Sequence, residues 1–160
     1  MTNLISTRAL SIIKSDNALI PYPATSATGS SSSVVANALV DNTKDFQALN
    51  IQVGNIVYNT TTNKAATVTY NPSSLSVDTL YLNDDIFTGS PEDYIIYQGG
   101  MSGSVNFGGG LYVGTGGILV ITTKGGDIVT MLNVQDGTFI PVLVIKVWNA
   151  TTASNILAIW

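Results

Sequence analysis

The chain has 160 residues, a formal net charge of −4, and neither cysteine nor histidine. Charged residues make up only 10% of it, against roughly 25% in an average globular protein. The absence of cysteine excludes disulfides. The six basic residues are scattered, which predicts no direct binding to nucleic acid. No apolar run approaches about 18 residues, which predicts no membrane insertion.

Residues 1–33 are predicted to form an N-terminal arm with edge strands. Residues 9–14 are apolar enough for a short strand, and Pro21 and Pro23 then interrupt regular pairing. The Ser/Thr/Gly run at 25–33 predicts a flexible loop. The alternative is an edge hairpin followed by a disordered loop.

Residues 34–99 are predicted to form a β-module. Its first strand is expected at 34–40, and residues 41–47 suit either one helical turn capped by Asp41 or a polar bend. Further strands are predicted at 53–59, 64–70, 79–82 and 94–97, with turns at 60–63 and 71–74. Short strands at such regular spacing favour a small barrel or sandwich.

Residues 108–160 are predicted to form a second β-domain, after a boundary at the paired glycines of 99–100 and 108–110. Its strands are expected at 111–113, 118–123, 128–134, 139–148 and 156–160, with a hairpin turn at 124–127. The run 139–148 is so apolar that we expect both of its faces to be buried, with Pro141 at an edge or bulge. No segment has a sustained helical period, so the fold class is all-β with antiparallel strands.

The absence of histidine removes triad chemistry, histidine bases and common zinc sites. A pair of carboxylates could still act as in glycosidases, and the acidic segment 78–93 offers Asp85 and Asp93. The other acids of this segment are Asp78, Asp84 and Glu92. Solvated loop carboxylates are the better interpretation, so we expect no enzyme and no catalytic residue.

Two further patterns suggest ligands only weakly. Asn83-Asp84-Asp85 has the oxygen atoms that calcium requires, but no recognised spacing. Gly114-Thr-Gly-Gly117 follows a strand as a phosphate loop does, but no helix pattern and no Gly-Lys-Ser/Thr follows it. We therefore expect neither a metal nor a cofactor. Four tyrosines are expected to pack in strands: Tyr58, Tyr70, Tyr81 and Tyr112.

Residues 111–160 carry a specific order of strand, turn and end sequences. These are Leu111-Tyr-Val-Gly-Thr-Gly-Gly117, Val120-Ile-Thr-Thr123, Gly126-Asp-Ile-Val-Thr130, Asn133-Val-Gln-Asp-Gly137, Phe139-Ile-Pro-Val142 and Ala150-Thr-Thr-Ala-Ser-Asn-Ile-Leu-Ala-Ile-Trp160. The segment resembles a small virion domain of the head-spike base proteins of gene transfer agents and of tailed-phage structural proteins. It departs from the family at Ile118-Leu119, which is apolar where relatives often have a more polar residue.

A looser resemblance lies upstream, to a module common in phage structural proteins. It is carried by Ala38-Leu-Val-Asp41, Phe46, Val53-Gly-Asn-Ile-Val-Tyr-Asn-Thr60, Ala65-Ala-Thr-Val-Thr69, Leu80, Leu82 and Asp85-Ile-Phe87. Neither family supplies catalytic residues that match positions of this chain.

The resemblances imply a virion protein on the capsid exterior. The expected function is that of a decoration or cement protein that binds the major capsid protein, and the expected assembly is a homotrimer. The alternative is a head-spike base or tail-associated protein that presents a host-binding spike or fibre; a glycan site would then use Tyr94, Tyr97 and Tyr112. A glycan depolymerase that uses Asp85 and Asp93 is the second alternative.

Overall fold

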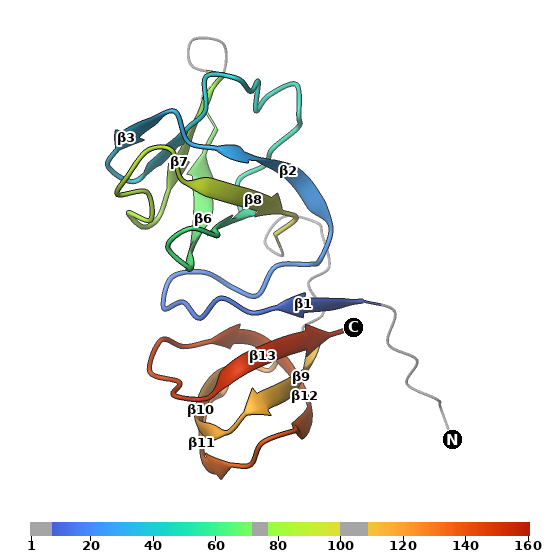
Figure 1. Ribbon diagram of the computed structural model, residues 1–160. Helices are drawn as coiled ribbons and strands as arrows, with labels where there is room; N and C mark the ends of the chain where they lie inside the picture. The colour runs from blue at the N-terminus through green and yellow to red at the C-terminus, as the bar shows by residue number, and fades with distance from the viewer. Residues whose placement is uncertain (1–7, 72–76, 100–108) are drawn as a thin grey trace. The chain divides into compact units, whose positions relative to one another are not determined.

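The computed structural model describes residues 8–71, 77–99 and 109–160 of the chain (Figure 1). These residues form two antiparallel sheets, of six and seven strands, and no helix. None of their segments is therefore a helix able to cross a membrane. The all-β, antiparallel prediction is confirmed, and neither sheet closes into a barrel.

The chain divides into two compact units, and the sequence of one is inserted into that of the other. The described residues 8–16 and 109–160 form what we call the C-terminal unit. The described residues between 17 and 99 form the inserted unit. The predicted arm at 1–33 differs from this division, because its described part contributes strands to both units.

The C-terminal unit contains the six-stranded sheet, in the order β1-β13-β9-β12-β10-β11. Its strands are β1 (Ala9–Ser11), β9 (Gly109–Thr115), β10 (Gly117–Thr123), β11 (Ile128–Val134), β12 (Thr138–Val147) and β13 (Ser154–Ile159). The last strand of the chain is thus an interior strand, hydrogen-bonded to β1 on one side and to β9 on the other. This confirms the prediction that the apolar end of the chain is part of the fold.

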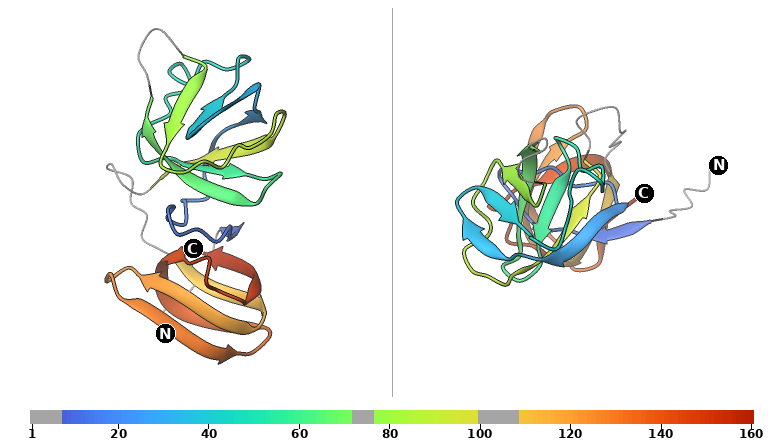
Figure 2. Two further views of the ribbon diagram at one scale, coloured as in Figure 1. Left: turned by 90° about the vertical axis from the view of Figure 1, so that its left-hand side faces the viewer. Right: turned by 90° about the horizontal axis from the view of Figure 1, so that it is seen from above.

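The long strand β12 joins the two halves of this sheet. Residues 138–144 pair with β9, whereas residues 144–147 pair with β10. The register shifts along β12 in both pairings, which allows the sheet to bend at these points. Figure 2 shows these orange to red strands from two further directions. Their buried side chains include Leu111, Val113, Leu119, Ile121, Ile140, Val144, Val147, Ile156 and Ala158.

The inserted unit contains the seven-stranded sheet, in the order β2-β8-β5-β6-β7-β4-β3. Its strands are β2 (Thr25–Ser30), β3 (Ser33–Val35), β4 (Ala38–Val40), β5 (Ile56–Asn59), β6 (Lys64–Tyr70), β7 (Thr79–Leu82) and β8 (Asp93–Tyr97). Its core is one cluster, formed by Leu39, Phe46, Ile51, Val57, Ala66, Val68, Leu80, Leu82, Ile86, Phe87, Tyr94 and Ile96. Residues 41–47 contain turns and no helix, and the Thr43 N–H donates to Asp41 Oδ1 at 3.0 Å.

Three predicted segments differ in the structure. Residues 25–30 form strand β2 rather than a loop, because they pair antiparallel with β8 from Thr25 to Ser30. Residues 34–40 do not form one strand, because Asn37 turns the chain in the left-handed region (φ 52°) and makes a hairpin of β3 and β4. The run 139–148 is not buried on both faces, since Phe139 and Leu143 lie at the surface.

Part of two predictions falls outside the described residues. The turn expected at 71–74 is described only at Asn71, and the glycine boundary is described only at Gly99, Gly109 and Gly110. Gly99 lies so close to the backbone that a Cβ there would be 1.5 Å from the Gly54 carbonyl oxygen. A side chain at residue 99 would therefore displace the loop that precedes β5.

Candidate interaction surfaces

Large apolar side chains are exposed on the C-terminal unit. They come from β9 to β12: Tyr112, Ile118, Ile128, Leu132, Phe139, Val142 and Leu143. Several of them alternate with buried residues, as expected of strands in a two-layer fold. Ile118 belongs to this set, whereas its neighbour Leu119 is fully buried.

Phe139 and Leu143 are the most exposed of these side chains on β12, at 51% and 53%. Phe139 lies opposite Tyr112 of β9, and its ring covers Gly110 so closely that a Cβ there would be 2.9 Å from Phe139 Cζ. Water reaches about half of each side chain, although both are strongly apolar. Exposed apolar side chains that gather in a patch are typical of a site that another protein covers, and these two are the candidates on β12.

A second cluster of the C-terminal unit fixes the loop after β12. Trp148 Nε1 donates to Thr122 Oγ1 at 2.9 Å, and Lys146 Nζ lies 4.3 Å from the centre of the Trp148 ring. Lys146 also donates to the Asp16 carbonyl oxygen at 2.7 Å, while the Asp16 carboxylate accepts two hydrogen bonds from Asn149. These groups satisfy one another, so they have a structural role.

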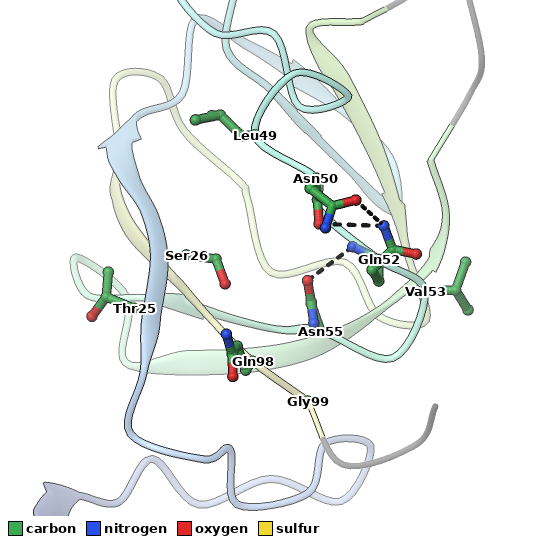
Figure 3. A pocket seen from close by; sticks show the side chains of 9 residues that line it. All are labelled: Thr25, Ser26, Leu49, Asn50, Gln52, Val53, Asn55, Gln98 and Gly99. Atoms are coloured by element: carbon green, nitrogen blue, oxygen red, sulfur yellow. Dashed lines mark hydrogen bonds between the residues drawn. The ribbon is translucent and has the colours of Figure 1, made fainter. Parts of the chain in front are cut away.

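The inserted unit has a cavity of about 310 Å³ with polar walls (Figure 3). It is lined by Thr25, Ser26, Leu49, Asn50, Gln52, Val53, Asn55, Gln98 and Gly99. Gln52 Nε2 donates to Asn50 Oδ1 at 2.7 Å, and Gln52 N–H donates to Asn55 Oδ1 at 2.9 Å. None of the described residues that line the cavity is charged or aromatic, and its polar side chains offer neutral hydrogen-bonding groups.

The acidic side chains of 78–93 occupy separate positions. Asp84 accepts from Asn17 Nδ2 at 2.9 Å, Asp93 accepts from Ser30, and Asp78 accepts from Thr79 Oγ1 at 3.0 Å. Glu92 is buried and accepts from Asn59 Nδ2 at 2.7 Å. Nowhere in the described part of the chain do three acidic side chains gather as they would around a metal ion.

Asp41 is buried and hydrogen-bonds to Tyr94 of the core cluster. Its carboxylate accepts from Tyr94 Oη at 2.6 Å and from the hydroxyl and N–H of Thr43 at 2.6 and 3.0 Å. Burial acts to raise the pKa of Asp41, but these hydrogen bonds and nearby Lys44 outweigh it, so the pKa is lowered. Burial and the same hydrogen bond raise the pKa of Tyr94.

Two of the three tyrosines expected at a glycan site are not at the surface. Tyr94 and Tyr97 are buried in the inserted unit, where Tyr97 packs edge-on against Tyr58 at 5.2 Å. Tyr112 belongs to the C-terminal unit. The expectation that Tyr94 and Tyr97 contribute to a surface aromatic site is therefore wrong, because both side chains are buried in the inserted unit.

Sequence reasoning missed an exposed aromatic pair in the inserted unit. Tyr70 and Tyr81 face each other on β6 and β7, with ring centres 5.9 Å apart, and both are exposed. The alternation of Leu80 and Leu82 around Tyr81 was the available signal, because it places Tyr81 on the outer face.

Comparisons of the chain with protein-family models, with curated proteins and with solved structures gave no match.

Proposed function

We propose that this protein is a decoration or cement protein of a tailed-phage capsid. The main support is the exposed apolar surface of the C-terminal unit, in a chain of which only 10% is charged. Little desolvation of charge opposes the burial of such a surface, and protein interfaces are depleted in charge at their centres. The same residues belong to the segment 111–160 that resembles a phage virion domain.

The proposed mechanism is mechanical. Phe139, Leu143 and their apolar neighbours bury against the major capsid protein on the exterior of the head. Burial contributes roughly 25 cal/mol per Å² of apolar area before the cost of association. Each copy that spans neighbouring capsid subunits then opposes their separation. The homotrimer implied by the resemblance would multiply such contacts on one particle.

A binding experiment with capsids tests this proposal. Purified protein is added to capsids of the tailed phage that encodes it, and bound protein is measured by co-sedimentation. We expect the double variant Phe139→Ser with Leu143→Ser to lose at least tenfold in affinity, because both apolar contacts are removed.

The matched control is Val34→Ser with Val35→Ser, which changes two exposed side chains of the inserted unit. It should bind as the unchanged protein does. Equal binding by the two double variants, with both folded by circular dichroism, would contradict the proposed surface, and no binding of the unchanged protein would contradict the function.

A further inference from the structure

We propose that the open edge of β11 pairs with the same edge of a second copy of the chain, antiparallel and around a two-fold axis at Thr130. This inference concerns self-association and does not depend on the proposed function. It rests on the hydrogen-bond pattern of β11, on the residues of this strand and on the match between the strand and a second copy of itself in antiparallel register.

The first observation is that, among the residues that the structure describes, β11 is the last strand of its sheet and pairs only with β10 (Figure 1). The Thr123 N–H donates to the Asp127 carbonyl oxygen at 2.9 Å. Thr123 and Asp127 are therefore a hydrogen-bonded pair, and hydrogen-bonded and non-hydrogen-bonded pairs alternate from there along β10 and β11. Val129 and Met131 therefore bond to β10, while the backbone groups of Ile128, Thr130 and Leu132 point to the open side.

The second observation is that this edge, apart from a β-bulge at its end near Asn133, lacks the usual protection against another strand. Natural proteins shorten their edge strands or place lysine or proline in them. Among the described strands, the outer strands β1 and β3 have three residues each, and β2 is built of small and polar residues. By contrast, β11 has seven residues and neither a charge nor a proline. Asn133 (φ 56°) interrupts regular backbone only near its end.

The third observation is the exposure of β11. Ile128 and Leu132 are the most exposed large apolar side chains among the described residues, at 65% and 68%. Both lie on the outer face, opposite to the face of Val129 and Met131, which pair with residues of the core. A neighbouring strand would cover each of them.

The sequence of β11 complements itself in one register. With Thr130 opposite Thr130 of the second copy, Ile128 lies opposite Leu132 and Val129 lies opposite Met131. Apolar residues then meet apolar residues, and the two threonines meet each other. Asp127 would lie opposite Asn133, so no like charges meet. Moving the axis to Met131 instead would place Val129 opposite Asn133 and Thr130 opposite Leu132.

The net charge of the C-terminal unit also permits a second copy of the chain to pair with β11. The described residues of the C-terminal unit carry four basic and three acidic side chains, so this unit is nearly neutral. The acidic excess of the chain lies in the inserted unit, which has seven acidic and two basic residues. Two copies can therefore approach through β11 without strong repulsion at the contact.

Cysteine cross-linking tests the register, because the chain has no cysteine of its own. Directly opposed, hydrogen-bonded residues lie about 5.5 Å apart at Cα, which suits a disulfide. We expect Thr130→Cys to form a disulfide-linked dimer under mild oxidation. Ile128→Cys and Leu132→Cys should cross-link when mixed, but neither should cross-link alone. Thr28→Cys, at an exposed threonine of β2, is the matched control.

Mass measurement in solution provides the second arm. The unchanged protein should have a mass that is an even multiple of 16.8 kDa, and Thr130→Lys should halve it, while Thr28→Lys should leave it unchanged. A monomeric or a trimeric mass would overturn the proposal, and so would a failure of Thr130→Cys to cross-link. So would equal cross-linking of Thr28→Cys and Thr130→Cys, or cross-linking of Ile128→Cys alone at the efficiency of the mixture. Thermal unfolding of each variant shows that it is folded.

Discussion

Asp41 shows how single residues hold the inserted unit together. Its carboxylate is buried and receives hydrogen bonds from Tyr94 and Thr43. Gly29 leaves the space that this network needs, since a Cβ there would lie 2.5 Å from Asp41 Oδ2 and 2.6 Å from Tyr94 Oη. A buried carboxylate with enough donors is stable, and one that loses its donors is costly.

The lowered pKa of Asp41 makes the stability of the inserted unit depend on pH. Because the folded state favours the ionised carboxylate, its contribution is fully present above the pKa of the unfolded chain, about 3.9. It is lost as the pH falls through the lower pKa of the folded state. We therefore expect the free energy of unfolding to decrease below about pH 5, and Asp41→Asn to weaken that decrease.

Urea unfolding at a series of pH values, from neutral to strongly acidic, measures the free energy of unfolding of the unchanged protein and of Asp41→Asn. The difference between the two proteins should shrink as the pH falls, because the protonated carboxyl no longer contributes. A constant difference over the whole range would show that Asp41 contributes through shape alone.

At the scale of elements, β13 is an interior strand of the sheet in the C-terminal unit. It lies between β1 and β9, and Ile156 and Ala158 fill the interior from it. Ile156→Ala removes buried methyl and methylene groups and leaves a cavity in the interior. It should therefore lower the free energy of unfolding by about 2–5 kcal/mol. Chemical denaturation measures this loss.

The control for this prediction is Leu143→Ala, at a half-exposed apolar residue of the same unit. Its effect on the isolated protein should stay within about 0.5 kcal/mol. Similar losses for the two variants would mean that β13 does not anchor the unit.

The strands that sequence predicts with correct bounds have turn residues on both sides. Residues 64–70, 79–82 and 128–134 are examples. By contrast, β2 has no apolar alternation, and its pairing with β8 makes it a strand. Apolar runs such as 139–148 and 94–97 do not reveal which face is buried, because tertiary packing decides it. The exposed surface of β12 and the burial of Tyr94 were therefore not predictable.

At the scale of the whole molecule, the two units differ in surface chemistry. The inserted unit carries the acidic segment 78–93, the polar cavity and the Tyr70–Tyr81 pair. The C-terminal unit is nearly neutral and exposes apolar side chains of β9 to β12. This difference supports the two proposals that β12 binds the capsid protein and that β11 pairs with a second copy.

Image reconstruction of whole virions of the encoding phage tests the proposed function most directly. We expect density that fits the two units on the outer surface of the head, with the C-terminal unit against the capsid shell. Particles without the protein should lose that density and rupture at a lower temperature. Density confined to the tail, or no difference between the two kinds of particle, would contradict the account.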